Sequence, residues 1–223
     1  MKTVSHKHNE LGKYFAQHLS AMTSDISPKQ IDRLWQDIMT RYGEPQRAYH
    51  TLDHIEQLLV QFENIKHHLS EPHIIALALY YHDVIYDPTR SDNELKSAEF
   101  ATDALGFYLS TEQCQQIHAL IMMTANHQLD TLVDSDKYND ATYLLDMDLS
   151  ILGTPWSSYE QYAKAIRQEY NHVADDNYRD GRTAVLQGLL AHPKLYLTDH
   201  YYDQLETQAR DNIKHELTSL AAL

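Results

Sequence analysis

Apolar residues recur at intervals of three and four along most of this chain, which is the spacing of one face of an α-helix. Polar and charged residues fill the positions between them, as on a helix with one buried face. Strand-like alternation is confined to short runs. The pattern therefore predicts an all-α fold. The clearest stripes are Ile31, Leu34, Trp35 and Ile38; Leu52, Ile55 and Leu59; and Ile117, Leu120, Ile121 and Thr124.

Boundary signals divide the chain into about nine or ten helices with mostly short connections. Ser27-Pro28-Lys29-Gln30 combines an N-cap, a proline at the first helical position and a capping-box glutamine. The segment 129–137 is predicted to be a longer loop. Because no stretch resembles a linker, we expect a single domain over residues 1–223. Further starts are predicted at Ser70-Glu71-Pro72, Ser91 with Glu94, Ser110 with Gln113, and Ser157 with Glu160, and stops at Gly43, Asp87-Pro88, Gly106 and Gly153.

Composition narrows the classes of function. Only 6 Gly and 6 Pro occur among 223 residues, which favours long helices, and 18 basic against 32 acidic residues give a formal net charge of −14. An acidic average field without any Lys/Arg-rich run argues against nucleic acid as a partner. Small anionic substrates stay compatible with this charge, because a bound dication dominates the field of its own site.

The expected location is the cytoplasm. No run approaches the roughly 20 apolar residues of a membrane span, so no membrane partner is expected. The first twenty residues lack the apolar core of a secretory signal. The single cysteine, Cys114, cannot form an internal disulfide and is expected to be inert. A homo-oligomer is compatible with the sequence.

His82 and Asp83 lie at the C-terminal end of the run 74–86, which is apolar nearly all round and is predicted to be a buried helix. An unpaired carboxylate in such a place would cost several kcal/mol, so something must compensate it. A salt bridge to an arginine or lysine is one solution and a metal ion is the other. The run alone leaves both open.

Asp148 is predicted to face the core. On a helix over 143–152 it shares its face with the leucines and isoleucine three and four positions away. Asp146 lies about 160° around the same helix. Asp146 is therefore predicted to be solvated, or to act as an acceptor behind the ligands, and Asp148 is the better ligand candidate.

His50 and His54 are spaced so that both imidazoles can reach one site from one helix. A pair of surface histidines on a polar stripe is the alternative. With His82, Asp83 and Asp148 they would form a donor set of nitrogen and oxygen without thiolates. Such a set suits a divalent metal ion, namely manganese, iron, cobalt or zinc, with magnesium also considered, and not a structural cysteine zinc site.

The ordered pattern H…HD…D resembles the HD superfamily of metal-dependent phosphohydrolases, and here it reads His54, His82-Asp83 and Asp148. The chain is most similar to an uncharacterised bacterial group of predicted HD-superfamily phosphohydrolases. The resemblance covers roughly residues 30–220 and implies an HD core over roughly 45–155, with C-terminal helices over 156–222 packed on it. It rests on RAYHTLDHI, ALYYHDVIYDP, NELKSAEF, LLDMDLSILG, IRQEY and ARDNIKHEL.

Two related groups imply roles for single residues. Cyclic-nucleotide phosphodiesterases carry Y-H-N-x-x-H, similar to Tyr49–His54, which implies His54 as a metal ligand and His50 as the acid for the leaving group. Thr51 departs from that motif, and no histidine follows the HD pair. Alarmone hydrolases carry H-D-x-x-E-D, in which Asp87 matches but Tyr86 replaces the glutamate. That departure counts against carrying their substrate over.

Four further residues are candidates for binding the substrate: Arg47, Asp87, Glu94 and His127. Arg47 offers a fork of donors suited to phosphate, although such an arginine is more often ion-paired. Glu94 could supply a carboxylate or could serve as the capping-box partner of Ser91. His127 could bind a second metal or phosphate, or could be an ordinary histidine at a helix terminus.

The resemblance implies a metal-dependent phosphohydrolase, either a phosphomonoesterase or a phosphodiesterase, acting on a nucleotide or another small phosphorylated substrate. A metal-activated water would attack phosphorus, with Asp83 both ligating the metal and orienting the water, and His50 protonating the leaving oxygen. Two alternatives stay open. One is an HD-type di-iron oxygenase using His127 with Glu94 or Asp87 as added ligands, and the other is a non-catalytic metal-binding regulatory module.

Overall fold

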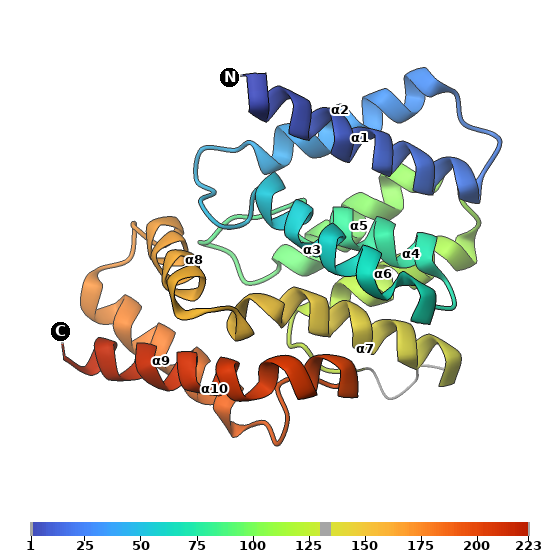
Figure 1. Cartoon of the computed structure of the whole chain (residues 1–223). Coiled ribbons are helices and arrows are strands. Elements are labelled where there is room, and N and C mark those ends of the chain that lie inside the picture. Colours follow the sequence, from blue (N-terminus) through green and yellow to red (C-terminus); the bar gives the residue numbers. More distant parts are fainter. Residues whose placement is uncertain (1, 130–134, 223) are drawn as a thin grey trace. The chain divides into compact units, whose positions relative to one another are not determined.

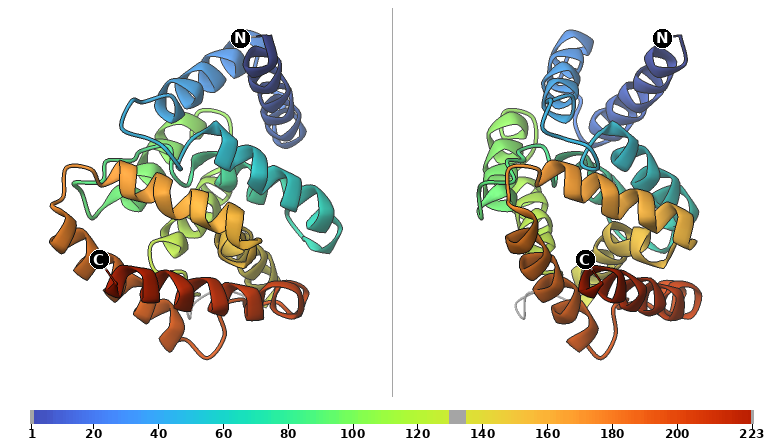
Figure 2. Two further views of the ribbon diagram at one scale, coloured as in Figure 1. Left: turned by 60° about the vertical axis from the view of Figure 1, so that its left-hand side comes forward. Right: turned by 90° about the vertical axis from the view of Figure 1, so that its left-hand side faces the viewer.

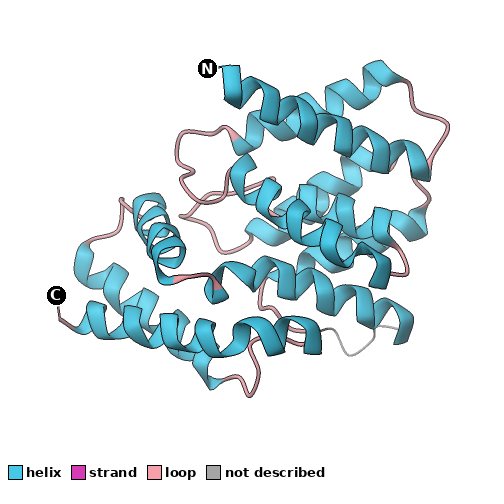
Figure 3. Cartoon of the chain, viewed as in Figure 1, coloured by secondary structure: helices cyan, strands magenta, loops and turns pink. Residues whose placement is uncertain are grey.

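A computed structural model describes the backbone of residues 2–129 and 135–222, and the side chains of residues 8–129 and 139–222. Within these ranges every regular element is a helix, as Figure 3 shows, so the predicted all-α class and helix number are confirmed. The elements are α1 (Lys2–Met22), α2 (Pro28–Tyr42), α3 (Leu52–Ile65), η1 (Lys66–His68), α4 (Pro72–Tyr81), α5 (Asn93–Leu105), α6 (Thr111–Thr124), α7 (Ser135–Leu149), η2 (Ser150–Gly153), α8 (Trp156–Glu169), α9 (Asp175–Ala191) and α10 (Asp199–Ala221) (Figure 1).

The chain divides into two compact units, Met1–Leu144 and Leu145–Leu223, here called unit 1 and unit 2. The division falls inside α7, so its last residues belong to unit 2 while the helix itself is continuous. The predicted single domain, with its core and C-terminal helices, stays a prediction. No helix in the described part of the chain combines the length and apolar character needed to cross a bilayer.

Most predicted helix boundaries are confirmed, and four are wrong. The helix predicted over 74–86 ends at Tyr81, so His82 and Asp83 follow it and the predicted stop at Asp87-Pro88 lies several residues beyond it. Pro28 opens α2, and the Ser110–Gln113 capping box before α6 is complete. However, Asp92 rather than Ser91 precedes α5, and α8 begins at Trp156, directly after a proline. Residues 135–137 are helical although a loop over 129–137 was expected, and positions 130–134 lie outside the described residues. At α5 and α8 the neighbouring loop or proline shifts the helix start by a residue or two without changing the periodic pattern.

The core of unit 1 is built around α4, in which every residue from Ile74 to Tyr81 is buried. This helix contacts α1, α3, α5 and α6, and α1 also packs against α2, as can be followed in Figures 1 and 2. The Tyr80 hydroxyl donates to the Leu11 carbonyl at 2.7 Å, and the Phe15 ring meets Tyr80 edge-on. A helix surrounded on all sides explains the run of apolar residues around its whole circumference.

The N-terminus of α4 is held by a carboxylate from another helix. Glu71, the N-cap residue, makes no side-chain cap. Instead Asp140, in the unit 1 part of α7, accepts from the Ser70 backbone N–H at 2.9 Å and the Glu71 N–H at 2.7 Å. These N–H groups have no partner within the helix, and a negative charge is favourable at this end of the helix dipole. Asp140 thus fixes the start of the helix whose other end carries His82.

Unit 2 uses Asp146 in a comparable way. Its carboxylate accepts from the backbone N–H groups of Leu197 and Thr198 and from the Thr198 hydroxyl, at 2.6–2.8 Å, just before α10. Asp146 is fully buried, and this burial raises the pKa of its carboxyl to about 6. The prediction that Asp146 is solvated is therefore wrong. Its helical face was assigned correctly as different from that of Asp148, but the segment before α10 covers it.

Candidate metal centre

His82 sits where α4 ends, as the residue that caps its C-terminus. Its side chain is 2% exposed, and its Nδ1 lies 2.9 Å from the Leu79 carbonyl oxygen. A carbonyl can only accept, so Nδ1 carries the hydrogen and, in the neutral ring, Nε2 carries the lone pair. A hydrogen bond on the rear nitrogen is the usual way in which a protein orients a metal-binding histidine.

His54 approaches His82 from the first turn of α3. Thr51 caps that helix by accepting from the Asp53 N–H, and His54 is buried two residues after the helix begins. The Nε2 atoms of His54 and His82 are 3.3 Å apart. Two lone pairs that face each other at this distance repel. A proton on His54 Nε2 or a shared cation is therefore needed between them.

Asp83 and His50 complete the group on its more open side. Asp83 Oδ2 lies 3.0 Å from His82 Nε2, and 3.9 Å from the Nε2 atoms of both His54 and His50. The side chains of Asp83 and His50 are 14% and 18% exposed, against 2% for the two deeper histidines. His50 does not share a helix with His54, as the spacing suggested, but lies in the loop before α3. It still reaches the group, with its ring 4.2 Å from that of Tyr86.

His54, His82 and Asp148 form a group that could hold a metal ion, since each offers one ligand atom and these atoms lie within 4.8 Å of one another. Asp148 lies at the C-terminal end of α7 and is partly exposed. Ligands at about 2.1 Å from one ion are separated by about 3.0 Å in an octahedron and about 3.4 Å in a tetrahedron. The separations of 3.3 Å and 3.0 Å around His82 Nε2 fit such a centre. The identity of the metal is not fixed by this geometry.

The backbone that carries Asp83 has no regular structure after Tyr81, and most carbonyls from Leu79 to Asp87 accept a hydrogen bond. Such groups need partners when they are buried, and here side chains from α2, from α5 and from the loop before α3 supply most of them. This pairing makes the segment specific in shape without a helix or strand. The donors are His82 on Leu79, Tyr42 on Tyr80, the Val84 N–H on Tyr81, Arg47 on Asp83 and Val84, Ser97 on Ile85, Gln46 on Tyr86, and Asn93 on Asp87.

Sequence reasoning missed the supporting residues Gln46, Tyr86 and Ser97. Tyr86 was noted only as a departure from a glutamate, whereas its ring packs on His50 and its carbonyl accepts from Gln46 at 3.1 Å. Ser97 both accepts from the Ile85 N–H and donates to the Ile85 carbonyl. Helical periodicity could have placed Ser97 on the buried face of α5, but periodicity does not identify Ile85 as its partner.

The four residues predicted to bind substrate lie outside the ligand group. Arg47 is buried, and its guanidinium donates to backbone carbonyls. Asp87 accepts from the Thr89 N–H and hydroxyl. Glu94 lies in the first turn of α5, and His127, with φ of 51°, follows the end of α6. Their roles in substrate binding stay predictions.

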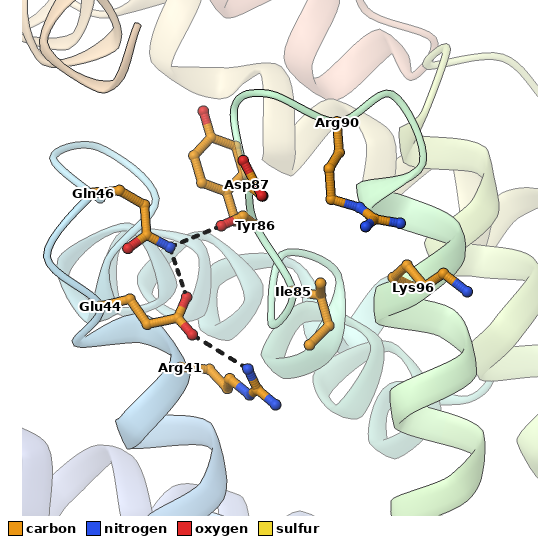
Figure 4. A pocket seen from close by; sticks show the side chains of 8 residues that line it. All are labelled: Arg41, Glu44, Gln46, Ile85, Tyr86, Asp87, Arg90 and Lys96. Carbon is orange, nitrogen blue, oxygen red and sulfur yellow. Dashed lines mark hydrogen bonds and ion pairs between the residues drawn. The ribbon is translucent and has the colours of Figure 1, made fainter. Parts of the chain in front are cut away.

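A pocket of about 330 Å³ lies beside the segment that follows Asp83 (Figure 4). Three cations reach it, and each already has a carboxylate partner: Arg41 with Glu44, Arg90 with Asp92, and Lys96 with Glu99. Figure 4 shows the Gln46 side chain between Glu44 and the Tyr86 carbonyl. The pocket is thus polar and close to charge balance. Its lining residues are Arg41, Glu44, Gln46, Ile85, Tyr86, Asp87, Arg90 and Lys96.

Comparison of the chain with protein-family models, with curated proteins and with solved structures found no match in any of the three. The resemblance to the HD superfamily therefore stays a prediction from the sequence motifs.

Proposed function

We propose that this chain is a metal-dependent phosphohydrolase that cleaves a phosphoester of a nucleotide or another small phosphorylated substrate. The observation that supports the proposal is the convergence of His54 Nε2, His82 Nε2 and Asp83 Oδ2 at separations of 3.0–3.9 Å. Asp148 forms a candidate metal-binding group with the same two histidines. Two buried imidazoles and carboxylates at this spacing are a donor set for a divalent cation.

A divalent ion held by His54, His82, Asp83 and Asp148 would supply Lewis-acid stabilisation of the phosphoryl oxygens and would acidify water at neutral pH. Side chains of the protein then orient the attacking water and protonate the leaving group. The more exposed Asp83 carboxylate accepts a hydrogen bond from the attacking water and orients it, and the proton that this water loses passes to solvent. As the new O–P bond forms and the ester P–O bond breaks, the His50 imidazolium donates its Nε2 proton to the leaving oxygen.

The difference in exposure between the histidines matches these two roles. His54 and His82 are closed off from solvent, as suits residues that hold an ion. His50 and Asp83 are partly open, so a substrate can reach them. The Tyr86 ring, 4.2 Å from the His50 ring, limits how far that imidazole can turn. These contacts support a role for His50 in acting on a bound ester instead of binding the ion.

The test begins with elemental analysis of the purified protein and a panel of phosphomonoesters and phosphodiesters assayed with the metal found. His82→Ala should lose both metal and turnover, because it removes a buried ligand. His50→Gln should retain the metal and lose about 10²- to 10⁴-fold in rate, the usual contribution of a general acid. His67→Gln is the matched control, since His67 is an exposed histidine on η1.

The outcomes separate the alternatives. Full turnover by the His82 variant would refute the proposal. Two irons per chain with consumption of oxygen would indicate the oxygenase class instead. Stoichiometric metal without turnover of any ester in the panel would indicate a binding or regulatory module.

A further inference from the structure

Arg47 occupies an unusual environment for a cation. Its side chain is fully enclosed, at 0% exposure, in unit 1. Its guanidinium carbon lies 4.9 Å from the centre of the Tyr42 ring and 5.4 Å from that of Tyr86. Among the residues whose side chains the structure describes, its one carboxylate contact is with Glu44, at 3.4 Å from Nε. A buried guanidinium is costly unless its N–H donors have acceptors, so the other acceptors of Arg47 indicate its role.

Those partners are the backbone carbonyls that frame the candidate metal centre. Nη1 donates to the His50 carbonyl at 3.0 Å and to the Asp83 carbonyl at 2.7 Å. Nη2 donates to the Val84 carbonyl at 3.0 Å. One planar group therefore joins the loop before α3 to the segment after α4. These are the two irregular segments that carry His50 and Asp83, whereas a helix terminus holds each of the buried histidines.

We propose that Arg47 is a positioning residue that holds Asp83 at its distance from His50, and through the placement of Asp83 sets the geometry of the metal centre. This inference rests on the proposed function for the role of the metal. It differs from the phosphate-clamp role predicted from the sequence, because the donors that would hold a phosphate are used on the chain's own carbonyls.

The chemistry of the side chain explains why an arginine is required. A guanidinium has five N–H donors in a rigid plane, so it can serve several carbonyls and still present both faces to aromatic rings. A lysine ammonium has three donors on a flexible stem and no plane to stack. Lysine at this position should therefore keep the charge and restore only part of the geometry.

The experiment compares Arg47→Met, which keeps an apolar stem but removes every donor, with Arg47→Lys. Arg182→Met is the matched control, because Arg182 is also buried and ion-paired, with Glu216 in unit 2. Each variant is titrated with Co²⁺, whose visible absorption reports the number and arrangement of ligands. Hydrogen exchange of the metal-free proteins is followed by mass spectrometry in peptides that cover residues 48–55 and 82–90.

Arg47→Met should weaken Co²⁺ binding about 10- to 100-fold, the usual effect of removing a residue that orients ligands, and should change the spectrum. Arg47→Lys should fall between Arg47→Met and wild type. Without metal, both peptides should exchange faster in the Arg47 variants. Arg182→Met should leave Co²⁺ binding and both peptides as in wild type. If Arg47→Met does not fold, Arg47→Lys alone carries the comparison.

The inference is overturned if the Arg47 variants match wild type in Co²⁺ affinity, spectrum and exchange, or if Arg182→Met alters them equally. A wild-type protein that binds no divalent metal would refute the proposed function instead. In that event exchange in the metal-free proteins still decides whether Arg47 joins the two segments.

Discussion

Asp140 provides the sharpest test of how unit 1 holds its central helix. Its carboxylate is 4% exposed and accepts from the Ser70 and Glu71 N–H groups at the start of α4. Hydrogen bonds to a charged acceptor contribute about 1.5–3 kcal/mol each. Two of them set an upper range of about 3–6 kcal/mol. Because Ser70 and Glu71 are exposed residues, water can replace part of this hydrogen-bond energy. Asp140→Ala should therefore lower the free energy of unfolding by about 2–3 kcal/mol.

The assay exploits the distribution of tryptophan. The chain has two tryptophans, Trp35 in unit 1 and Trp156 in unit 2, so a Trp156→Phe background makes fluorescence report unit 1 alone. In urea a slope of about 2 kcal/mol per M converts the expected loss into a midpoint lower by about 1–1.5 M. Asp103→Ala, at an exposed position on α5, should change stability by less than about 0.5 kcal/mol.

Equal midpoints for the Asp140 and Asp103 variants would refute the reasoning. That result would mean that water replaces the carboxylate without loss, and that the start of α4 is fixed by apolar packing alone. A change in the urea slope instead of the midpoint would indicate that Asp140→Ala alters the compactness of the unfolded or native state, and the hydrogen-bond estimate would then not apply.

Two further predictions concern pH and steric fit. His18, whose Nδ1 lies 3.0 Å from that of His73, has a pKa lowered to about 4 by burial and by His73, with Lys66 lowering it further and Glu63 opposing. The unfolded state then binds the proton more readily, so the contribution of His18 to stability is full above pH 6.5, and stability falls by roughly 3 kcal/mol as the pH drops towards 4. His18→Gln should flatten this dependence of stability on pH in urea titrations that follow Trp35. An unchanged dependence on pH would contradict the lowered pKa of His18. Gly153→Ala would place a Cβ 2.5 Å from that of Leu205 and should cost about 1–3 kcal/mol, measured through Trp156 in a Trp35→Phe background. Gly181→Ala meets nothing within 4 Å and should stabilise α9 by about 0.5–1 kcal/mol. Stabilisation by both substitutions would show that the contact with Leu205 is unimportant.

Part of the candidate metal centre could be predicted from the local periodicity of apolar residues. The apolar run before His82 predicted a buried helix, and α4 is buried from Ile74 to Tyr81. The prediction of the buried helix succeeded because helical periodicity depends only on residues within a few positions of one another. The same periodicity placed Asp148 towards the core and Asp146 away from it, whereas Asp146 is fully buried and Asp148 is partly exposed.

Other features failed where the deciding contact comes from a distant segment. Asp146 was expected in solvent, and only the packing of residues 197 and 198 buries it. His50 was placed on a helix, but Thr51 caps α3 after it, so the histidine reaches Asp83 from a loop. The phosphate-binding role of Arg47 stays a prediction, because the sequence shows the donors of Arg47 but not the carbonyls of Asp83 and Val84 that accept from them.

The sequence by itself therefore determined the helical class, the buried helix before the histidine–aspartate pair, and which residue types are available to bind a cation. The tertiary structure alone decided which donor meets which acceptor. Periodicity fixes the face on which a side chain lies, but an irregular segment such as 83–87 takes its shape from partners 36–40 residues earlier and 6–12 residues later in the chain. Those pairings depend on how the helices pack, which no local pattern contains.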